Sequence, residues 1–328
     1  MITEIPKQPD RGGDKIASID IGSHTVRMLV AERQFSPELY KPLLRKRGYS
    51  RLADGFRKND ERRLQPEAID RTLLLLDDCS LTLQEYGVVH PQAVSTGVVR
   101  DAVNKDDFIQ RIYHQTGIRV RVISGEHEAL LTKLGVWHSL DMMEGASIIF
   151  DLGGGTTEFI FTKAEETLIR SLPIGAMVFT QQFLNSGTPH AEKIDHLFTH
   201  TQEVLEEAFP ERYEIQEGFT LIGSGGTVTT LAAMINQMEV SDITPAKLNG
   251  LKITREQIQD LFSSMRVLSH EDRLHLPGLD EGRAEVILAG TLAVIQIMHF
   301  FRSFHLTVSY SDMLEGALIH YLQGEKYE

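Results

Sequence analysis

The sequence has 328 residues, 41% of them hydrophobic and 24% charged, which is typical of a globular protein long enough for two domains. The net charge of −13 argues against general nucleic-acid binding, and no apolar run reaches the roughly 18 residues that a membrane span needs. Cys79 is the only cysteine, so an intrachain disulfide is excluded, and residues 1–14 lack the apolar core of a signal peptide. We expect a cytoplasmic protein.

The first half of the sequence predicts alternating strands and helices, the pattern of an α/β layer. Strands are expected at residues 15–20, 25–33, 92–96 and 118–123, and helices at 65–86, 106–115 and 126–137. Pro66 and Gly87 mark the two ends of the first helix, and Ser124 is a suitable N-cap for the last. Residues 41–63 concentrate positive charge, either as a solvated edge of the fold or as the lining of an anion channel.

The second half repeats part of this pattern. Strands are expected at residues 147–151, 158–162, 166–172, 219–223 and 305–309, and helices at 228–238, 281–301 and 312–322. The segment Ile19-Asp20-Ile21-Gly22-Ser23 aligns without a gap with Phe150-Asp151-Leu152-Gly153-Gly154. One domain architecture that is used twice explains this repeat, and the boundary between the two copies is expected near residues 135–146.

Glycine-rich turns follow the two aligned strands, and such turns can bring backbone N–H groups close to a phosphate. Asp20 and Asp151 end the preceding strands, where a carboxylate can hold Mg²⁺ or its water shell. Either turn alone is explained by the need to join two strands, whereas two turns in one register favour a ligand held from both sides. The turns contain Gly22, Ser23 and His24 in one case and Gly153, Gly154, Gly155, Thr156 and Thr157 in the other.

A third glycine-rich segment, Gly223-Ser224-Gly225-Gly226-Thr227, joins an expected strand to an expected helix. Its N–H groups and the helix dipole could bind an anion. Close packing of the turn is an equally good explanation.

Three charged side chains are candidates for handling phosphate and water. Glu128 lies in the first turn of the helix after Ser124 and could act as a general base, although an acidic residue there also simply favours the helix N-terminus. Arg27 and Arg100 could clamp phosphate, because a guanidinium can bind two oxygens at once. Both positions would also suit an ordinary surface arginine.

Together these motifs resemble the exopolyphosphatase/guanosine pentaphosphate phosphatase (Ppx/GppA) family of the actin-like superfamily. The similarity covers nearly the whole chain, and residues 123–129 (ISGEHEA) narrow the match most. The other matching segments are residues 19–23 (IDIGS), 95–102 (STGVVRDA), 151–158 (DLGGGTTE), 224–231 (SGGTVTTL) and 283–290 (RAEVILAG).

The resemblance implies an α/β fold of two actin-like (ribonuclease H-like) domains, residues 1–137 and 138–311, with a ligand cleft between them. A closing helix at about residues 312–325 would pack back on the first domain, as in the short form of the family. Glu128 would be the general base, and Asp20, Asp151 and Glu158 would hold Mg²⁺ (or Mn²⁺). A homodimer is also implied. The implied phosphate-binding residues are Gly22, Ser23, His24, Arg27, Arg100, Gly153, Gly154, Gly155, Thr156, Thr157, Gly225, Gly226 and Thr227.

Three residues depart from the pattern of the family. His24 stands where the family commonly has Asn, and Leu130 and Leu314 stand where it has Arg. The loss of two arginines should weaken polyanion binding more than it weakens the chemistry, which leaves the length of the substrate open.

The expected activity is release of the terminal phosphate from inorganic polyphosphate or guanosine pentaphosphate. A regulator that binds guanosine penta- or tetraphosphate in the same cleft and turns over little is the alternative, favoured by the three departures. A kinase or ATPase is disfavoured by residues 123–129.

Overall fold

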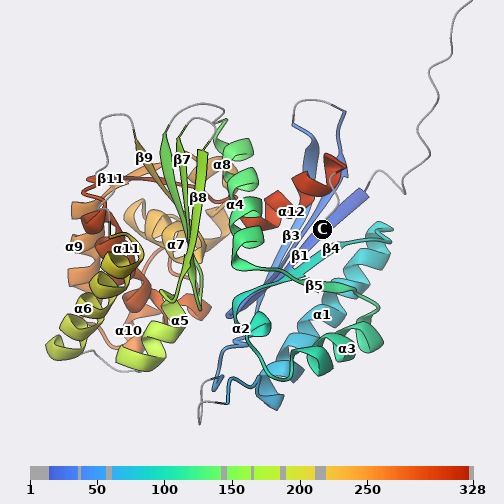
Figure 1. Ribbon diagram of the computed structural model, residues 1–328, viewed down its shortest axis with the longest axis horizontal. Coiled ribbons are helices and arrows are strands. Elements are labelled where there is room, and N and C mark those ends of the chain that lie inside the picture. The colour runs from blue at the N-terminus through green and yellow to red at the C-terminus, as the bar shows by residue number, and fades with distance from the viewer. Residues whose placement is uncertain are drawn as a thin grey trace, which may run out of the picture.

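The computed structural model describes residues 15–35, 38–56, 61–141, 146–163, 166–184, 190–210 and 219–324. Its two mixed sheets lie side by side, each covered by helices (Figure 1). This arrangement confirms the α/β class. Among the described residues, no helix is long and apolar enough to cross a membrane.

The first sheet has the strand order β3-β2-β1-β4-β5. Six of the seven residues of β1 are buried, as expected for a central strand with an apolar sequence. The strands are β1 (Lys15–Ile21), β2 (Thr25–Arg33), β3 (Tyr40–Tyr49), β4 (Gln92–Ser95) and β5 (Val120–Val122). The helices of this half are α1 (Pro66–Tyr86), α2 (Gly97–Arg100), α3 (Lys105–Thr116) and α4 (Gly125–Leu140).

The second sheet has the order β10-β11-β9-β6-β7-β8 and holds the larger apolar core. Its strands are β6 (Ser147–Leu152), β7 (Thr157–Lys163), β8 (Glu166–Leu172), β9 (Thr220–Ser224), β10 (Lys252–Thr254) and β11 (His305–Val308). The α-helices are α5 (Ala176–Phe179), α6 (Ala191–Ala208), α7 (Gly226–Ile235), α8 (Pro245–Leu248), α9 (Arg255–Met265), α10 (His270–Arg273), α11 (Ile287–Phe300) and α12 (Met313–Leu322). Short π- and 3₁₀-helical segments are η2 (Thr180–Leu184), η3 (Val240–Asp242) and η4 (Glu281–Arg283).

The repeated sequence unit forms the same substructure in both sheets. β1 pairs with β2 antiparallel and with β4 in parallel, and β6 pairs in the same way with β7 and β9. Each hairpin is closed by one backbone hydrogen bond, from Gly22 to Thr25 in the first and from Gly153 to Thr156 in the second. The two glycine loops therefore occupy equivalent positions at the ends of equivalent strands.

The last helix, α12, lies against the first half of the chain. It packs on α4, β1 and β2, as the red ribbon of Figure 1 shows. α4 and α12 approach so closely because a glycine lies on each: a Cβ on Gly316 would be 1.8 Å from the Leu131 carbonyl oxygen, and one on Gly135 would be 2.0 Å from that of Asp312.

The helix predicted at residues 281–301 is wrong at its start. Residues 281–283 form the 3₁₀ turn η4, and α11 begins only at Ile287. The side chain of Asp280 caps this turn by accepting from the N–H of Gly282, whose carbonyl oxygen is bound by His24 from the other half. Tertiary contacts thus interrupt a segment whose local sequence favours a helix.

Residues 41–63 prove to contain β3, an edge strand, followed by turns. Arg57 and Lys58 of this basic segment lie outside the described residues, as do residues 142–145 of the expected domain boundary.

Replacement of Gly316 by Ala should lower the melting temperature, because the added methyl group meets rigid backbone rather than a movable side chain. Overpacking of this kind typically costs about 1–3 kcal/mol. Gly48→Ala is the matched control, since its Cβ would meet the flexible end of the Leu75 side chain at 2.3 Å. Thermal unfolding followed by circular dichroism measures both, and equal melting temperatures for the two variants would contradict the account of the crossing.

Candidate active site

A small cavity of ≈ 80 Å³ lies where the two halves meet. All three glycine loops reach it, together with carboxylates from β1, α4, β6, β7 and the start of α12. Its lining includes Asp20, Gly22, Ser23, His24, Arg27, Glu128, Asp151, Gly153, Gly154, Gly155, Thr156, Glu158, Gly225, Gly226, Arg283 and Asp312. Residues that are up to about 290 positions apart in the sequence are therefore neighbours in one site.

The first two loops face each other at close range. A Cβ on Gly154 would lie 3.3 Å from the Cβ atoms of both Ser23 and His24, and a Cβ on Gly155 would lie 3.0 Å from Ser23 Oγ. The second loop is also joined to α5, because the N–H of Met177 donates to the Gly154 carbonyl oxygen at 2.9 Å. The glycines are needed for this approach, which brings backbone from both halves around a space the size of a small anion.

The third loop packs on the second. Gly225 has φ of 91°, and a Cβ there would lie 2.8 Å from Asp151 Oδ1. Gly226 begins α7 and lies under the guanidinium of Arg283, since a Cβ would be 1.7 Å from Arg283 Nη2. An arginine and a helix N-terminus therefore border the cavity at the same point, a combination that favours an anion.

Glu128 is held in the first turn of α4, which Ser124 caps by accepting from the N–H of His127 at 3.1 Å. The side chain is buried, and its Oε2 has no hydrogen-bond partner. Arg100 Nη1 is 3.6 Å from that oxygen. Burial, followed by the charges of Glu158 and Asp151, raises the pKa of Glu128 well above its ordinary value, against the opposing effect of Arg100. A carboxyl group with these properties is suited to proton transfer.

Asp151 and Glu158 lie directly opposite each other on β6 and β7. Burial, with the nearby charges of Asp312 and Glu158, raises the pKa of Asp151 to about 8. Burial also raises the pKa of Glu158, although Ser171 Oγ donates to its Oε1 at 2.8 Å. Glu158 is buried and Asp151 half-buried, so the two carboxyl groups form an acidic site that is incompletely neutralised by the protein.

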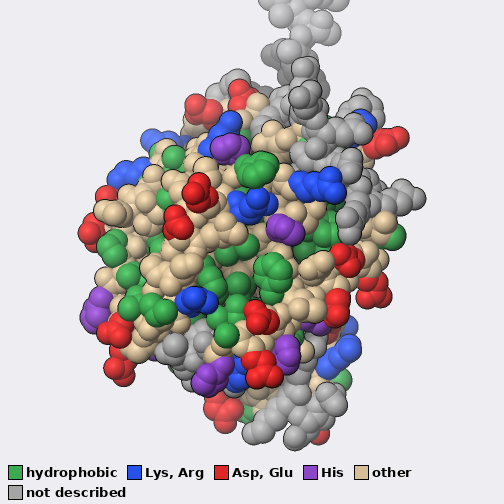
Figure 2. Space-filling view, turned by 90° about the vertical axis from the view of Figure 1, so that its left-hand side faces the viewer, with side chains coloured by type: hydrophobic (Ala, Val, Ile, Leu, Met, Phe, Trp, Pro, Cys, Tyr) green, Lys and Arg blue, Asp and Glu red, His purple; other side chains and the backbone are tan. Residues whose placement is uncertain are grey.

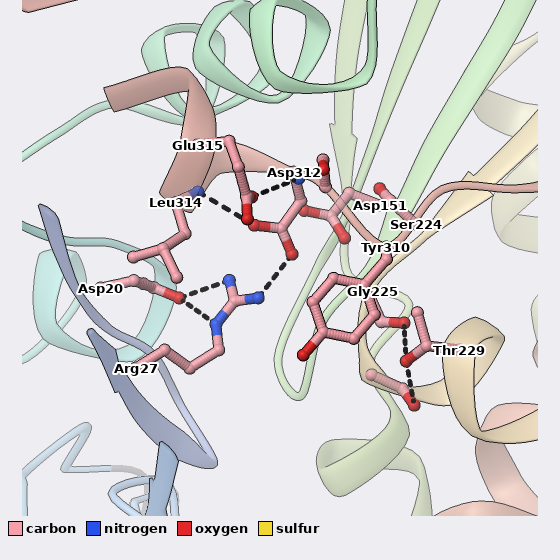
Figure 3. Close-up of polar contacts among 12 residues, drawn as sticks. Asp20, Arg27, Asp151, Ser224, Gly225, Thr229, Tyr310, Asp312, Leu314 and Glu315 are labelled. Atoms are coloured by element: carbon pink, nitrogen blue, oxygen red, sulfur yellow. Dashed lines mark hydrogen bonds and ion pairs between the residues drawn. The ribbon is translucent and has the colours of Figure 1, made fainter. Parts of the chain in front are cut away.

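Arg27 lies between two further carboxylates (Figure 3). Its Nε and Nη2 donate to Asp20 Oδ2 at 2.9 and 2.6 Å, and its Nη1 donates to Asp312 Oδ2 at 2.5 Å. Although burial opposes it, these two carboxylates raise the pKa of Arg27 well above its usual value. All three guanidinium nitrogens are thus engaged within the protein, while Asp20 Oδ1 remains buried without a partner.

Some of the residues expected to bind phosphate lie away from the small cavity. The hydroxyl of Thr157 donates to the Ile174 carbonyl oxygen at 2.5 Å, and Thr227 is buried against Gly290. Arg100 lines a neighbouring cavity of ≈ 570 Å³, which meets the small one at Ser23, Gly155 and Thr156.

The residues that depart from the family pattern have different surroundings. Leu130 is exposed on α4, whereas Leu314 is buried in an apolar cluster with Ile16, Leu29 and Leu318. Leu314 also borders a third cavity, of ≈ 190 Å³. The side chain of Leu314 is therefore held by apolar packing.

The third cavity is lined by the basic part of β3, but its cations have acidic partners. Arg45 pairs with Glu315, Lys46 with Asp78 at 2.8 Å, and Arg47 with Asp280 at 2.8 Å. These ion pairs neutralise much of the positive charge that the sequence concentrates there.

Two charged residues of the cavity were not among the candidates from the sequence. Asp312 forms a capping box with Glu315 at the start of α12, and the spacing Asp-x-x-Glu before an apolar run was a readable signal for a helix start. Arg283 lies in the segment RAEVILAG, but no local pattern indicates that its side chain turns toward a loop about 60 residues earlier in the chain.

The carboxyl groups are a reasonable donor set for Mg²⁺. Within the described part of the chain, no three His, Cys, Asp or Glu side chains form a ready-made metal cage. Mg²⁺ needs none, because it usually keeps several waters and binds one or two carboxylates together with substrate phosphates. The unpartnered oxygens of Asp20 and Glu128 and the raised pKa values of Asp151 and Glu158 are features that a divalent cation would relieve.

Curated relatives match nearly the whole chain. A bifunctional 3-dehydroquinate synthase/phosphatase of Fusobacterium nucleatum is 31% identical over 94% of this chain, which spans only 47% of that protein. Exopolyphosphatase 2 of Mycobacterium tuberculosis is 28% identical, with 92% of this chain and 97% of the relative covered. A guanosine-5'-triphosphate,3'-diphosphate pyrophosphatase of Aeromonas salmonicida is 28% identical, with 95% and 60% covered.

The fold of this chain matches that of solved structures whose sequences are similar to it. A crystal structure of the Aquifex aeolicus member of the Ppx/GppA protein family superposes with a TM-score of 0.77 at 30% identity, covering 96% of this chain and 99% of that one. The two halves accordingly have the actin-like fold. The model of the Ppx/GppA phosphatase family matches residues 30–325, and the chain belongs to that family.

Proposed function

We propose that the protein is a Mg²⁺-dependent (or Mn²⁺-dependent) phosphohydrolase that releases the terminal phosphate of inorganic polyphosphate or guanosine pentaphosphate. The observation that carries the proposal is the buried Glu128, whose unpartnered Oε2 belongs to a cavity lined by glycine loops and carboxyl groups of both halves. A membership in a phosphatase family supports the reaction type.

In the proposed reaction, Glu128 orients a water molecule and takes its proton while the water oxygen attacks the terminal phosphorus. The bond from that phosphorus to the bridging oxygen breaks, and the shortened chain leaves with the bonding electron pair. A raised pKa suits this role, because it makes the carboxylate of Glu128 a stronger proton acceptor than a solvent-exposed one. Ser124 caps the turn of α4 that carries Glu128, and the guanidinium of Arg100 lies 3.6 Å from Glu128 Oε2.

The loops would bind the terminal phosphate between the two halves. Ser23 and Thr156 contribute hydroxyl groups, and the glycine backbone allows N–H groups to approach the phosphate oxygens. Arg283 would add positive charge from above Gly226. Preorganised donors of this kind stabilise the charge that develops in the transition state.

Asp20, Asp151 and Glu158 would hold the divalent cation. When bound, the cation would neutralise phosphate oxygens and stabilise the charge on the transferred group. Asp151 and Glu158 would keep it at the second loop, and Asp20 Oδ1 would contribute from the first.

The part of the substrate beyond the terminal phosphate would occupy the ≈ 570 Å³ cavity. That cavity has the size of a small-molecule site and mixes polar residues with the apolar side chains of Phe56, Val98 and Val178. The names of the relatives include both an exopolyphosphatase and a guanosine pyrophosphatase, so both substrates are proposed.

A regulator with little turnover is the second candidate. Arg27 is fully engaged by Asp20 and Asp312, so one of the cations expected to bind phosphate is neutralised within the protein. Binding of guanosine pentaphosphate or tetraphosphate without phosphate release would support this alternative.

A homodimer is a prediction from the family resemblance, and a cytoplasmic location is a prediction from the sequence. The face in Figure 2 shows hydrophobic side chains gathered near its centre, bordered by charged ones. Light scattering of the purified protein would determine the oligomeric state.

Replacement of Glu128 by Gln should reduce phosphate release from medium-chain polyphosphate or guanosine pentaphosphate by about 10²-fold or more, because the amide cannot accept the proton of water. Glu126→Gln is the matched control, since Glu126 lies in the same helical turn but is exposed. Colorimetric phosphate assays with Mg²⁺ compare the variants on each substrate. Equal losses in both variants would contradict the role of Glu128, and binding without release by the wild type would favour the regulator.

Replacement of Asp151 by Asn should stabilise the metal-free protein more at pH 8 than at pH 5. The pKa of Asp151 is raised from 3.8 to about 8, so the folded state binds the extra proton and loses stability as the pH rises through this window. The Asn side chain does not titrate, so the variant lacks this loss of stability. A difference of about 1 kcal/mol in the free energy of unfolding corresponds to roughly 2–4 °C in melting temperature.

Thermal unfolding in chelator at both pH values, with the exposed Asp260→Asn as control, measures the effect. Added Mg²⁺ should raise the melting temperature of the wild type at pH 8 and leave that of Asp151→Asn nearly unchanged. A variant less stable than the wild type at pH 8 without metal would show that Asp151 is not a source of repulsion.

A further inference from the structure

The two sides of the junction between the halves differ: one is held by direct contacts, and the other is open. On one side, residues 280–285 of the second half are bound by four side chains from the first half. Tyr49 donates to Asp280, Arg47 pairs with the same carboxylate at 2.8 Å, and Arg51 is 3.3 Å from Glu285. The fourth contact is made by His24, whose Nε2 is 2.9 Å from the Gly282 carbonyl oxygen. The other side opens into the ≈ 570 Å³ cavity.

The hydrogen bond from His24 determines its tautomer. A carbonyl oxygen only accepts, so Nε2 carries the hydrogen and Nδ1 is left as the bare nitrogen. His24 is 4% exposed, and Nδ1 is buried with no hydrogen-bond partner. Burial and the nearby positive charge of Arg283 lower the pKa of His24 to about 3, so the ring is neutral at physiological pH. The tyrosine ring of Tyr49 packs edge-on against it, with centroids 5.3 Å apart.

This bond connects the first glycine loop to the segment that carries Arg283, and both contribute side chains to the small cavity. His24 follows Ser23 in the first loop, and its own carbonyl oxygen accepts from the N–H of Arg51 at 3.0 Å. Gly282 directly precedes Arg283, whose side chain is 9% exposed and whose Nε is buried without a partner. Because that Nε has no hydrogen bond to orient it, the placement of the guanidinium depends strongly on the backbone that His24 holds.

We propose that His24 is a positioning residue: its hydrogen bond to Gly282 ties the first loop to the segment that carries Arg283 and keeps that guanidinium over the phosphate site. The inference rests on the proposed function for the identity of the ligand, a terminal phosphate group. The resemblance implied that His24 contacts the phosphate itself. In this proposal, His24 instead affects phosphate binding through Arg283.

Two substitutions of His24 distinguish the roles of its two ring nitrogens. Gln places its amide N–H about where Nε2 lies and can still donate to Gly282, whereas Asn places its N–H about where Nδ1 lies, which has no partner. His24→Asn should therefore weaken binding of inorganic tripolyphosphate by about tenfold, within the range for loss of one buried hydrogen bond. His24→Gln should stay within about twofold of the wild type.

Titration calorimetry in a Glu128→Gln background measures this binding without turnover. In the active protein, His24→Asn should lower kcat/KM by about tenfold or more, because Arg283 contributes to both phosphate binding and the transition state, whereas His24→Gln should not. Hydrogen exchange of the metal-free protein should show faster exchange of residues 280–285 in His24→Asn alone. A circular dichroism melt confirms that each variant is folded.

A double-mutant cycle with Arg283→Gln tests whether His24 acts through the arginine. If it does, His24→Asn should cost almost nothing once Arg283 is gone. Additive losses, or equal losses in His24→Asn and His24→Gln, would overturn the proposal in favour of direct phosphate contact. Unchanged binding and exchange in His24→Asn would also overturn it. If the wild type binds tripolyphosphate but releases no phosphate, the proposed function fails while binding and exchange still decide the role of His24.

Discussion

The site depends on five carboxyl groups that are gathered around one small cavity, four of them buried and one, that of Asp151, half-buried. Asp20, Glu128, Asp151, Glu158 and Asp312 come from both halves of the chain. Burial raises the pKa of the first four of these groups, which favours their neutral forms. Nearby arginines compensate only part of this charge. The protein therefore gives up folding stability at this site, a pattern common at functional sites. Under the proposed function, a cation and a phosphate ligand would compensate the remaining charge.

The repeated hairpin explains how one architecture supports two different tasks. In the first half Asp20 lies opposite Arg27, and in the second half Asp151 lies opposite Glu158 in the same register. The first pair is an ion pair that also binds Asp312, so it joins α12 to β1 and β2. The second pair is repulsive. We infer that the first hairpin mainly organises the junction of the two halves, while the second is the better position for a metal ion.

Much of this could be predicted from local sequence. The two aligned loops, the strands that carry them and the capped start of α4 follow from spacing and residue type, which act over a few neighbouring residues. The partners of Arg27 could not be predicted, because Asp312 is 285 residues away and is brought there by the crossing of α4 and α12. Arg283 was missed for the same reason. A pattern predicts where a side chain lies along its own element, whereas the cavity is defined by contacts between elements.

Calorimetric titration of the metal-free protein with Mg²⁺ at pH 7, repeated in two buffers of different ionisation enthalpy, tests the central claim most directly. Because the pKa of Asp151 is about 8, much of this carboxyl group is protonated at pH 7, and a bound cation should displace the proton. We predict a net release of a substantial fraction of one proton per Mg²⁺, which is smaller in Asp151→Asn. Binding heats that are the same in both buffers, or an absence of Mg²⁺ binding, would contradict the claim that the buried carboxyl groups form a cation site.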